Sequence, residues 1–253
     1  MAYTLDLSGR SALITGGTRG IGFAIARALG AAGARVVVAS RKEGAVDEAV
    51  DALRADGVTA MGVAANVGDA DDRERLVRAT IERHGALDVL VNNAAANPVY
   101  GPVEDTEAWA FAKIMQVNLE APFELAKLAL PHLAERPDAH VLNVSSIGGL
   151  TPEAGLGIYS VSKAALNSLT RVLAKEWGPR GIHVNAICPG LIQTDFSEAL
   201  WSDERVLGSL TRRTPLGRVG QPEEIGRLTL AIVGGLTPYA TGHIFTADGG
   251  YTI

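Results

Sequence analysis

Short apolar segments alternate with longer amphipathic ones along the whole chain, and this alternation constrains the fold more than any other feature. Val36-Val37-Val38-Ala39 is typical of the apolar segments, because it is apolar on both faces. A strand of this kind is expected inside a parallel sheet that helices cover on both sides. We therefore predict a doubly wound α/β fold, a Rossmann-type sheet of about seven parallel strands between two helical layers.

The predicted elements follow one another without a separating linker. We expect strands at 11–15, 35–40, 59–64, 87–92, 140–145, 183–187 and 243–247. We expect helices near 20–32, 43–55, 69–84, 105–135, 158–177 and 221–234. Because no Pro/Ser-rich stretch, low-complexity tract or repeat divides them, residues 1–253 are expected to form a single domain.

Residues 191–217, the lid segment, interrupt the alternation. They follow a predicted strand, yet they mix apolar and charged side chains as a surface helix does. An ordinary packed helix is one interpretation. Since ligands of open α/β sheets bind beyond the carboxyl ends of the strands, we favour a lid over the substrate. Its apolar side would consist of Phe196, Leu200, Trp201, Leu207 and Leu210.

The composition narrows the class of protein. A hydrophobic content of 47% indicates a large core, and a net charge of −5 disfavours a nucleic-acid binder. Charged residues interrupt every apolar run of about 18 residues, so no membrane span is expected. The start of the chain has no secretory signal, and Cys188 is the single cysteine, so we expect a cytoplasmic protein without disulfides. Cys188 has no His or Cys at metal-ligand spacing, so we predict a buried thiol and no metal site.

A glycine-rich turn joins the first predicted strand to the first predicted helix. In Thr15-Gly16-Gly17-Thr18-Arg19-Gly20-Ile21-Gly22, glycines allow a tight turn and let the backbone approach a pyrophosphate at the helix N-terminus. Many loops are glycine-rich, so the turn alone is a weak signal. At the first strand–helix junction of an alternating chain it becomes a strong one.

The end of the second predicted strand bears on the choice of dinucleotide. An enzyme that selects NAD usually has an acidic residue there, which binds the ribose hydroxyls. This chain has Ser40-Arg41-Lys42 instead, and Arg19 is available from the turn. A guanidinium can bind a 2′-phosphate through charge-assisted hydrogen bonds, although solvated turn residues are the alternative. The missing acid favours NADPH over NADH.

Tyr159 and Lys163 are four residues apart, which places both on one face of a helix. A nearby ammonium favours the phenolate, so we expect Lys163 to lower the pKa of Tyr159 from its ordinary value of about 10. An exposed pair without function is the alternative. The glycine-rich turn, Asn118 and Ser146 in the same chain decide for an enzyme.

Together these motifs resemble the short-chain dehydrogenase/reductase family over nearly the full length of the chain. The resemblance rests on the glycine-rich turn, Asn92-Asn93-Ala94-Ala95, Asn118, Ser146 thirteen residues before Tyr159, and Pro189-Gly190 followed by Ile192 and Thr194. Ser40-Arg41-Lys42 and the stretches 93–98 and 189–201 look like those of NADP-dependent carbonyl and retinal reductases. Two positions depart from the family pattern. Ala95 replaces a glycine and should be tolerated if its φ is negative, and Asn66 replaces an aspartate and can still contact adenine.

The resemblance implies NADP(H) as cofactor and four catalytic residues. Tyr159 would donate a proton to the substrate, and Lys163 would lower the pKa of Tyr159 and bind the nicotinamide ribose. Ser146 would orient the substrate carbonyl, and Asn118 would hold a water. The implied cofactor-binding residues are Gly16, Thr18, Arg19, Gly20, Ile21, Gly22, Ser40, Arg41, Asn66, Val67, Asn93, Ala94, Ala95, Tyr159, Lys163, Pro189, Gly190, Ile192 and Thr194.

The expected reaction is reduction of an apolar or aromatic ketone or aldehyde, because Pro98, Val99, Tyr100, Leu156 and Ile158 would line a mostly apolar pocket. A 3-oxoacyl-[acyl-carrier-protein] reductase is the alternative, and a basic patch beside the cleft would be its signature. A non-catalytic, cofactor-sensing protein has no need of the catalytic residues. The resemblance also implies a homotetramer, with interfaces on helices 105–135 and 158–177 and on the last strand with Asp248-Gly249-Gly250.

Overall fold

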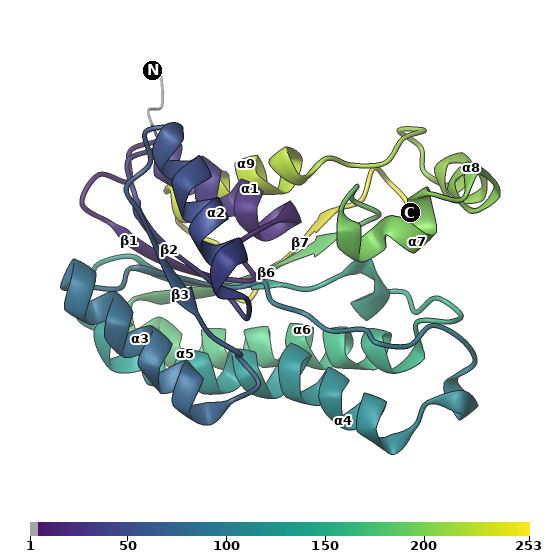
Figure 1. The fold of residues 1–253 in the computed structure, drawn as a ribbon, viewed down its shortest axis with the longest axis horizontal. Coiled ribbons are helices and arrows are strands. Elements are labelled where there is room, and N and C mark those ends of the chain that lie inside the picture. The colour runs from purple at the N-terminus through teal and green to yellow at the C-terminus, as the bar shows by residue number, and fades with distance from the viewer. Residues whose placement is uncertain (1–4) are drawn as a thin grey trace.

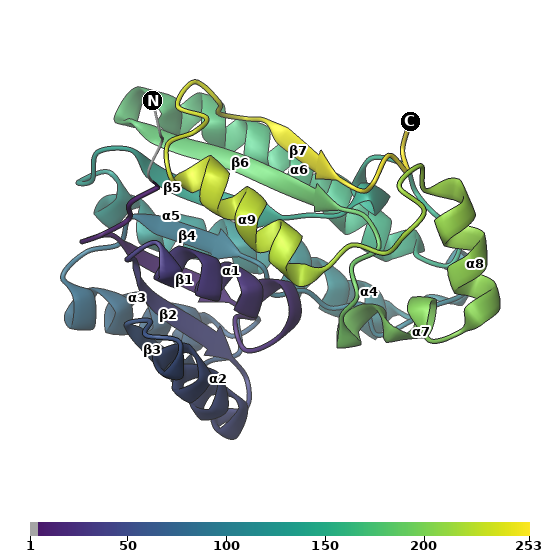
Figure 2. The same cartoon turned by 90° about the horizontal axis from the view of Figure 1, so that it is seen from above.

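The computed structural model describes residues 5–253, and within this range the strands form one seven-stranded parallel sheet (Figures 1 and 2). The strands are β1 (Ser11–Thr15), β2 (Arg35–Ser40), β3 (Ala60–Ala64), β4 (Val89–Asn92), β5 (Ala139–Val144), β6 (Ile182–Pro189) and β7 (Ile244–Ala247). Their order is β3-β2-β1-β4-β5-β6-β7, which confirms the predicted doubly wound fold. The order reverses between β1 and β4, so the loops that follow these two strands diverge and leave a crevice at the carboxyl edge of the sheet.

Helices cover both faces of the sheet. α1 (Gly20–Ala31), α2 (Glu43–Ala55) and α9 (Pro222–Val233) lie on one face, and α3 (Ala70–His84), α4 (Ala108–Met115), α5 (Ala121–Leu133) and α6 (Gly157–Trp177) lie on the other (Figure 1). Val36 and Val38 pack into the core cluster that includes α1 and α9, whereas Val37 and Ala39 pack into the cluster that includes α5 and α6. Alternate residues of β2 thus enter opposite cores, as its continuous apolar run predicts.

The helix predicted over 105–135 is interrupted. α4 ends at Met115, a π-helical turn spans Gln116–Glu120, and α5 begins at Ala121. Asn118 lies in this turn and is fully buried. Its amide group accepts a hydrogen bond from the backbone N–H of Ala96 at 2.8 Å and donates one to the Ala96 carbonyl at 3.0 Å. The turn therefore places a buried amide against the loop that follows β4.

The lid segment extends beyond the carboxyl ends of β6 and β7, at the same end of the molecule as the C-terminus (Figures 1 and 2). It contains α7 (Glu198–Trp201) and α8 (Glu204–Arg213). The indole N–H of Trp201 donates to the Thr194 carbonyl at 2.9 Å, so α7 folds back on the start of the segment. The other end of the lid segment is held by the N–H of Leu216, which donates to the carbonyl of Gly249 at 3.1 Å.

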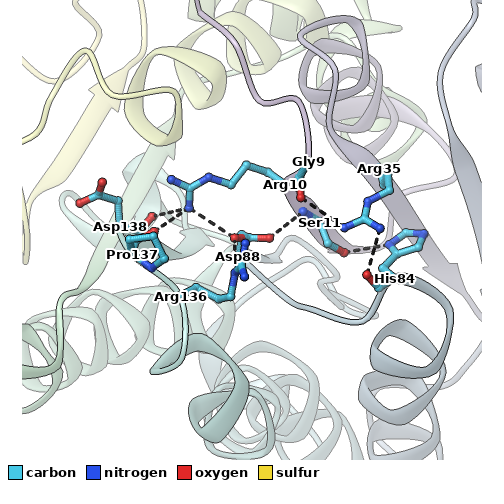
Figure 3. Close-up of polar contacts among 9 residues, drawn as sticks. All are labelled: Gly9, Arg10, Ser11, Arg35, His84, Asp88, Arg136, Pro137 and Asp138. Carbon is cyan, nitrogen blue, oxygen red and sulfur yellow. Dashed lines mark hydrogen bonds and ion pairs between the residues drawn. The ribbon is translucent and has the colours of Figure 1, made fainter.

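A polar cluster joins the opposite, amino edge of the sheet (Figure 3). The carboxylate of Asp88 has no exposed surface and accepts hydrogen bonds from Arg136 Nε at 2.8 Å, Arg10 Nη1 at 3.3 Å and the backbone N–H of Ser11 at 2.8 Å. The Ser11 hydroxyl in turn lies 2.8 Å from Nδ1 of His84. These bonds tie together the segments that lead into β1, β4 and β5.

No helix within residues 5–253 is long and apolar enough to cross a membrane.

Candidate active site

The turn between β1 and α1 has the geometry of an anion-binding loop. Gly16 and Gly20 have φ values of 63° and 52°, in the left-handed region that favours glycine. A Cβ atom added to Gly22 would lie 2.2 Å from the Gly16 carbonyl oxygen, so no side chain fits there. α1 has neither a side-chain cap nor an acidic residue in its first turn. Its first N–H groups and the positive end of its dipole are therefore available to a phosphate.

This turn lines a cleft of about 480 Å³, the main cleft, at the carboxyl edge of the sheet. The predicted cofactor residues that line it are Gly16, Thr18, Arg19, Gly20, Ile21, Gly22, Ser40, Arg41, Asn66, Val67, Asn93, Ala94, Ala95, Tyr159, Lys163 and Thr194. Pro189, Gly190 and Ile192 do not line it. Ile192 is buried in the core, and Gly190 lies against Asp248, so these residues shape the backbone that leads to Thr194.

The two predicted phosphate-binding arginines differ in their surroundings. Arg41 makes no side-chain hydrogen bond or ion pair with any residue of the range 5–253, so its guanidinium group is available at the end of β2. Arg19 is paired instead: its Nη1 lies 2.9 Å from Oδ2 of Asp195, at the start of the lid segment. The sequence does not predict this pairing, because the two residues are 176 positions apart.

Asn93 and Ala95 show how the loop after β4 meets the glycine-rich turn. The amide N–H groups of Asn93 donate to the carbonyls of Thr15 at 2.9 Å and Gly16 at 3.0 Å, so this side chain holds the turn in place. Ala95 tolerates its methyl group without strain, because Asp138 is the only residue other than glycine with a positive φ in the range 5–253.

The side chains of Tyr159 and Lys163 come from the first two turns of α6 and are both buried. Lys163 is 2% exposed, and its Nζ donates to the Val144 carbonyl at 2.8 Å. The same Nζ lies 5.6 Å from the centroid of the Tyr159 ring. Burial lowers the pKa of Lys163 to about 8, so the amine is mostly protonated at neutral pH.

The pKa of Tyr159 shifts in the direction opposite to the prediction. Burial raises it to about 12, and a hydrogen bond with Ser146 opposes this shift only in part. The expected net lowering of this pKa is wrong for the structure described, because desolvation of the buried phenolate raises it, and the Lys163 amine, which is bonded to the Val144 carbonyl, does not offset the rise. Tyr159 is thus a protonated phenol at neutral pH, which is the form that a proton donor needs.

Hydrogen bonds link both Ser146 and, through Ser162, Asn118 to Tyr159. Asn118 Nδ2 also donates to the hydroxyl of Ser162 at 3.0 Å, and that hydroxyl donates to the Tyr159 carbonyl at 2.7 Å. Both N–H groups of the Asn118 amide are therefore used within the protein, and its predicted role of holding a water stays a prediction. The Ser146 hydroxyl accepts from the N–H of Gly148 at 3.0 Å, which fixes it beside Tyr159.

A second cavity of about 370 Å³, the side pocket, adjoins the main cleft. All five predicted apolar residues line it: Pro98, Val99, Tyr100, Leu156 and Ile158. Tyr159, Asn97 and Pro98 line both cavities, so these residues lie where the two cavities meet. Of the apolar lid residues, only Phe196 lines either cavity, and its ring centroid lies 6.1 Å from that of Tyr159.

Comparisons with known proteins agree with this geometry. Residues 16–252 match a family model described as enoyl-(acyl carrier protein) reductase. The human dehydrogenase/reductase SDR family member 4 is 41% identical over 244 residues, which cover 96% of this chain and 88% of that protein. The chain belongs to the short-chain dehydrogenase/reductase family. Tropinone reductase-like 3 of Erythroxylum coca is 38% identical over 242 residues, covering 96% of this chain and 93% of that protein.

A solved member of the family, the RhlG/NADP active-site complex of Pseudomonas aeruginosa, is 35% identical, covers 100% of both chains and superposes with a TM-score of 0.92. As a short-chain dehydrogenase/reductase, this chain is an NAD(P)-dependent oxidoreductase. Its own residues fit such a dinucleotide: the uncapped N-terminus of α1 suits the pyrophosphate, and the glycines leave the space that it requires.

Two charged residues that line the main cleft of this short-chain dehydrogenase/reductase were not predicted from the sequence. Asp195 lines the main cleft and directly follows the predicted Thr194. Its position beyond the end of a strand is the signal from which its place in the cleft could have been predicted. Lys113 lines the main cleft from α4, where a lysine looks like an ordinary surface residue. Cys188 is fully buried as predicted, and burial raises the pKa of its thiol.

Proposed function

We propose that this short-chain dehydrogenase/reductase uses NADPH to reduce the carbonyl group of an apolar or aromatic ketone or aldehyde to an alcohol. The observation that carries the proposal is the position of Tyr159, at the junction of the main cleft and the side pocket. A phenol there can donate its proton to a carbonyl oxygen placed in the side pocket. The bound dinucleotide supplies the hydride, whereas the protein supplies the proton, the charge and the alignment.

The surroundings of Tyr159 support proton donation. Its raised pKa keeps the phenol protonated at neutral pH. As the proton leaves, negative charge develops on the phenolic oxygen, and the buried Lys163 ammonium and the Ser146 hydroxyl stabilise it. The same Ser146 hydroxyl can orient the substrate carbonyl, because it lies beside the phenol.

The lining of the side pocket supports a neutral, apolar substrate. Its volume of about 370 Å³ suits a small molecule. Among the described residues that line it there is no Lys, Arg or His, and Asp105 is the one carboxylate. A substrate carboxylate or phosphate would meet no cation there, so an uncharged ketone or aldehyde is the better match.

The preference for NADPH is supported by Arg41, whose guanidinium group is unpaired within residues 5–253 and lines the main cleft. No carboxylate among the described residues follows β2 directly, where an NAD-selective enzyme would have one. The RhlG structure is a complex with NADP, which is consistent with this choice for a related chain.

The assay that tests the proposal follows NADPH oxidation with a panel of apolar ketones, aromatic aldehydes and acetoacetyl thioesters. We expect turnover with the ketones or aldehydes and little with the thioesters. A clear preference for thioesters would favour the oxoacyl-carrier-protein reductase instead. That alternative needs a basic patch, and Arg213 of the lid segment is already paired with Glu153.

We also propose a homotetramer, as the family resemblance implies. Trp109, Phe111 and Phe123 on α4 and α5 and Val161 and Val172 on α6 are exposed apolar side chains that a partner subunit would cover. Light scattering of the purified protein measures this directly, and a monomeric mass would reject the assembly. The cytoplasmic location stays a prediction.

A further inference from the structure

The start of the lid segment is held to the glycine-rich turn by an ion pair. Arg19 Nη1 and Asp195 Oδ2 are 2.9 Å apart, and both side chains are more than two-thirds exposed, at 69% and 68%. The Thr194 side chain also approaches the turn closely, since a Cβ added to Gly20 would lie 3.1 Å from Cγ2 of Thr194. All four residues line the main cleft, so this contact forms part of the wall of the cleft that would hold a dinucleotide.

The end of the lid segment is held by a second ion pair. Glu153 Oε1 accepts from Arg213 Nη2 at 3.2 Å and from the hydroxyl of Tyr251 at 2.8 Å. The Arg213 guanidinium also lies 4.5 Å from the centroid of the Tyr251 ring. α8, the C-terminal segment and the turn before α6 therefore meet at one carboxylate.

Glu153 lies two residues before a part of the chain that lines the side pocket. Gly155 and Leu156 both line that pocket, and the N–H of Gly101 donates to the Gly155 carbonyl at 3.1 Å. A Cβ added to Gly155 would lie 2.8 Å from the Tyr100 ring, so the two walls of the pocket are in direct contact. Glu153 is thus joined to the pocket walls through the two residues that follow it.

We propose that the two ion pairs are positioning contacts with separate tasks: Arg19–Asp195 sets how long the dinucleotide stays bound, and Arg213–Glu153 sets the fit of the substrate in the side pocket. The second task rests on the proposed function, and the first does not. Neither Asp195 nor Glu153 is among the residues that line the side pocket, so neither is expected to touch the substrate. Each acts through the end of the lid segment that it holds.

The test compares Asp195→Ala and Glu153→Ala in the full chain with Asp56→Ala. Asp56, directly after α2, pairs with Arg27 of α1 at 2.8 Å, with exposures of 53% for Arg27 and 37% for Asp56, so this is a matched surface pair away from the lid segment. Exposed pairs of this kind change equilibria by about two- to fivefold. We expect Asp195→Ala to speed the release of NADPH and of NADH by about that factor, measured by stopped-flow fluorescence without substrate. Glu153→Ala should raise the KM of the best carbonyl substrate by a similar factor and leave kcat and dinucleotide release unchanged.

Hydrogen exchange of the NADPH-bound protein gives a readout that needs no turnover. We expect Asp195→Ala to increase exchange at residues 194–201 and Glu153→Ala to increase it at residues 204–216, with no change in Asp56→Ala. The charge-swapped variant Glu153→Arg/Arg213→Glu should recover most of the protection at 204–216, because the pair is restored with opposite polarity. If none of the carbonyl compounds supports NADPH oxidation by the wild-type protein, the proposed function fails. The exchange experiment still decides whether the two ion pairs have separate tasks.

Two results would overturn the proposal. Slower release of NADPH from Asp195→Ala, with NADH release unchanged, would show that Asp195 competes with the 2′-phosphate for Arg19 rather than closing the cleft. Equal effects of both variants on both ends of the lid segment would show that the segment moves as one unit, without separate tasks.

Discussion

The amino and carboxyl edges of the sheet are both rich in polar groups, yet they use them differently. At the amino edge, Asp88 is surrounded by Arg10, Arg136 and the N–H of Ser11, and the cluster closes on itself (Figure 3). At the carboxyl edge, the first N–H groups of α1 have no side-chain cap, and Arg41 has no partner within residues 5–253.

This difference separates a structural cluster from a binding site. Buried charges that satisfy one another hold the fold together and leave nothing for a ligand. Donors that are held in place without an acceptor are the arrangement that binds an anion. Substitutions at the amino edge should therefore change stability and spare the chemistry, whereas those at the carboxyl edge should do the reverse.

The largest effect is expected for Tyr159→Phe. Removing the phenolic hydroxyl takes away the proton donor, so kcat for carbonyl reduction should fall by about 10²–10⁴-fold while NADPH binding is retained. Steady-state kinetics and a fluorescence titration with NADPH measure the two quantities. Tyr239→Phe is the control, because Tyr239 is fully exposed and outside both cavities. Substantial residual reductase activity in Tyr159→Phe would defeat the proposed mechanism.

Asp88→Ala should produce the corresponding effect at the amino edge. The variant leaves Arg10, Arg136 and the Ser11 N–H without their common acceptor, so the free energy of unfolding should drop by about 3–5 kcal/mol. Urea denaturation at one protein concentration measures it. Glu82→Ala removes the exposed partner of Arg78 and should cost less than about 1 kcal/mol. A strong loss of kcat in folded Asp88→Ala protein would contradict the separation of the two edges.

Arg41→Ala tests the free donor of the carboxyl edge. A hydrogen bond to a charged group contributes about 1.5–3 kcal/mol, so the KM for NADPH should rise about tenfold or more while the KM for NADH stays the same. Lys42→Ala is the control, because Lys42 is adjacent in sequence and does not line the main cleft. Equal changes for both dinucleotides would mean that Arg41 does not select the 2′-phosphate.

The fold could be predicted from local patterns. The runs 11–15 and 35–40 are strands β1 and β2 with the expected bounds. A short run that is apolar on both faces forms a strand inside a parallel sheet that helices cover on both sides. The interruption of the helix 105–135 was not foreseen. It coincides with the contact between Asn118 and Ala96, and Pro122 at the start of α5 has no N–H to donate to the Asn118 carbonyl, so this proline is the sequence signal that marks the break.

The candidate site was predicted less evenly. Residue types near each strand end indicated which side chains line the main cleft, since the carboxyl ends of parallel strands share one edge. The pairing of Arg19 with Asp195 could not be predicted, because it joins distant segments. The pKa of Tyr159 was predicted in the wrong direction, because spacing on a helix reveals the neighbouring Lys163 and does not reveal the burial that outweighs it.

The smallest expected effect is the pH dependence of carbonyl reduction, which the charge of Lys163 governs. Because its pKa is about 8, the lysine loses its charge above that pH, and kcat/KM for carbonyl reduction should fall there to a level less than about tenfold below its value at pH 7. The phenol of Tyr159, with a pKa of about 12, stays protonated and adds no decline below pH 10. His140, near the amino edge, titrates far below pH 8, because burial lowers its pKa from 6.5 to about 4. At pH 8 its imidazole is therefore neutral whether the chain is folded or unfolded. Its ionisation therefore adds no change in stability there, and unfolding temperatures measured at the same pH values check this. A rate that stays constant to pH 10 would show that the charge of Lys163 does not assist proton transfer, and the function of the pair would then lie in position alone.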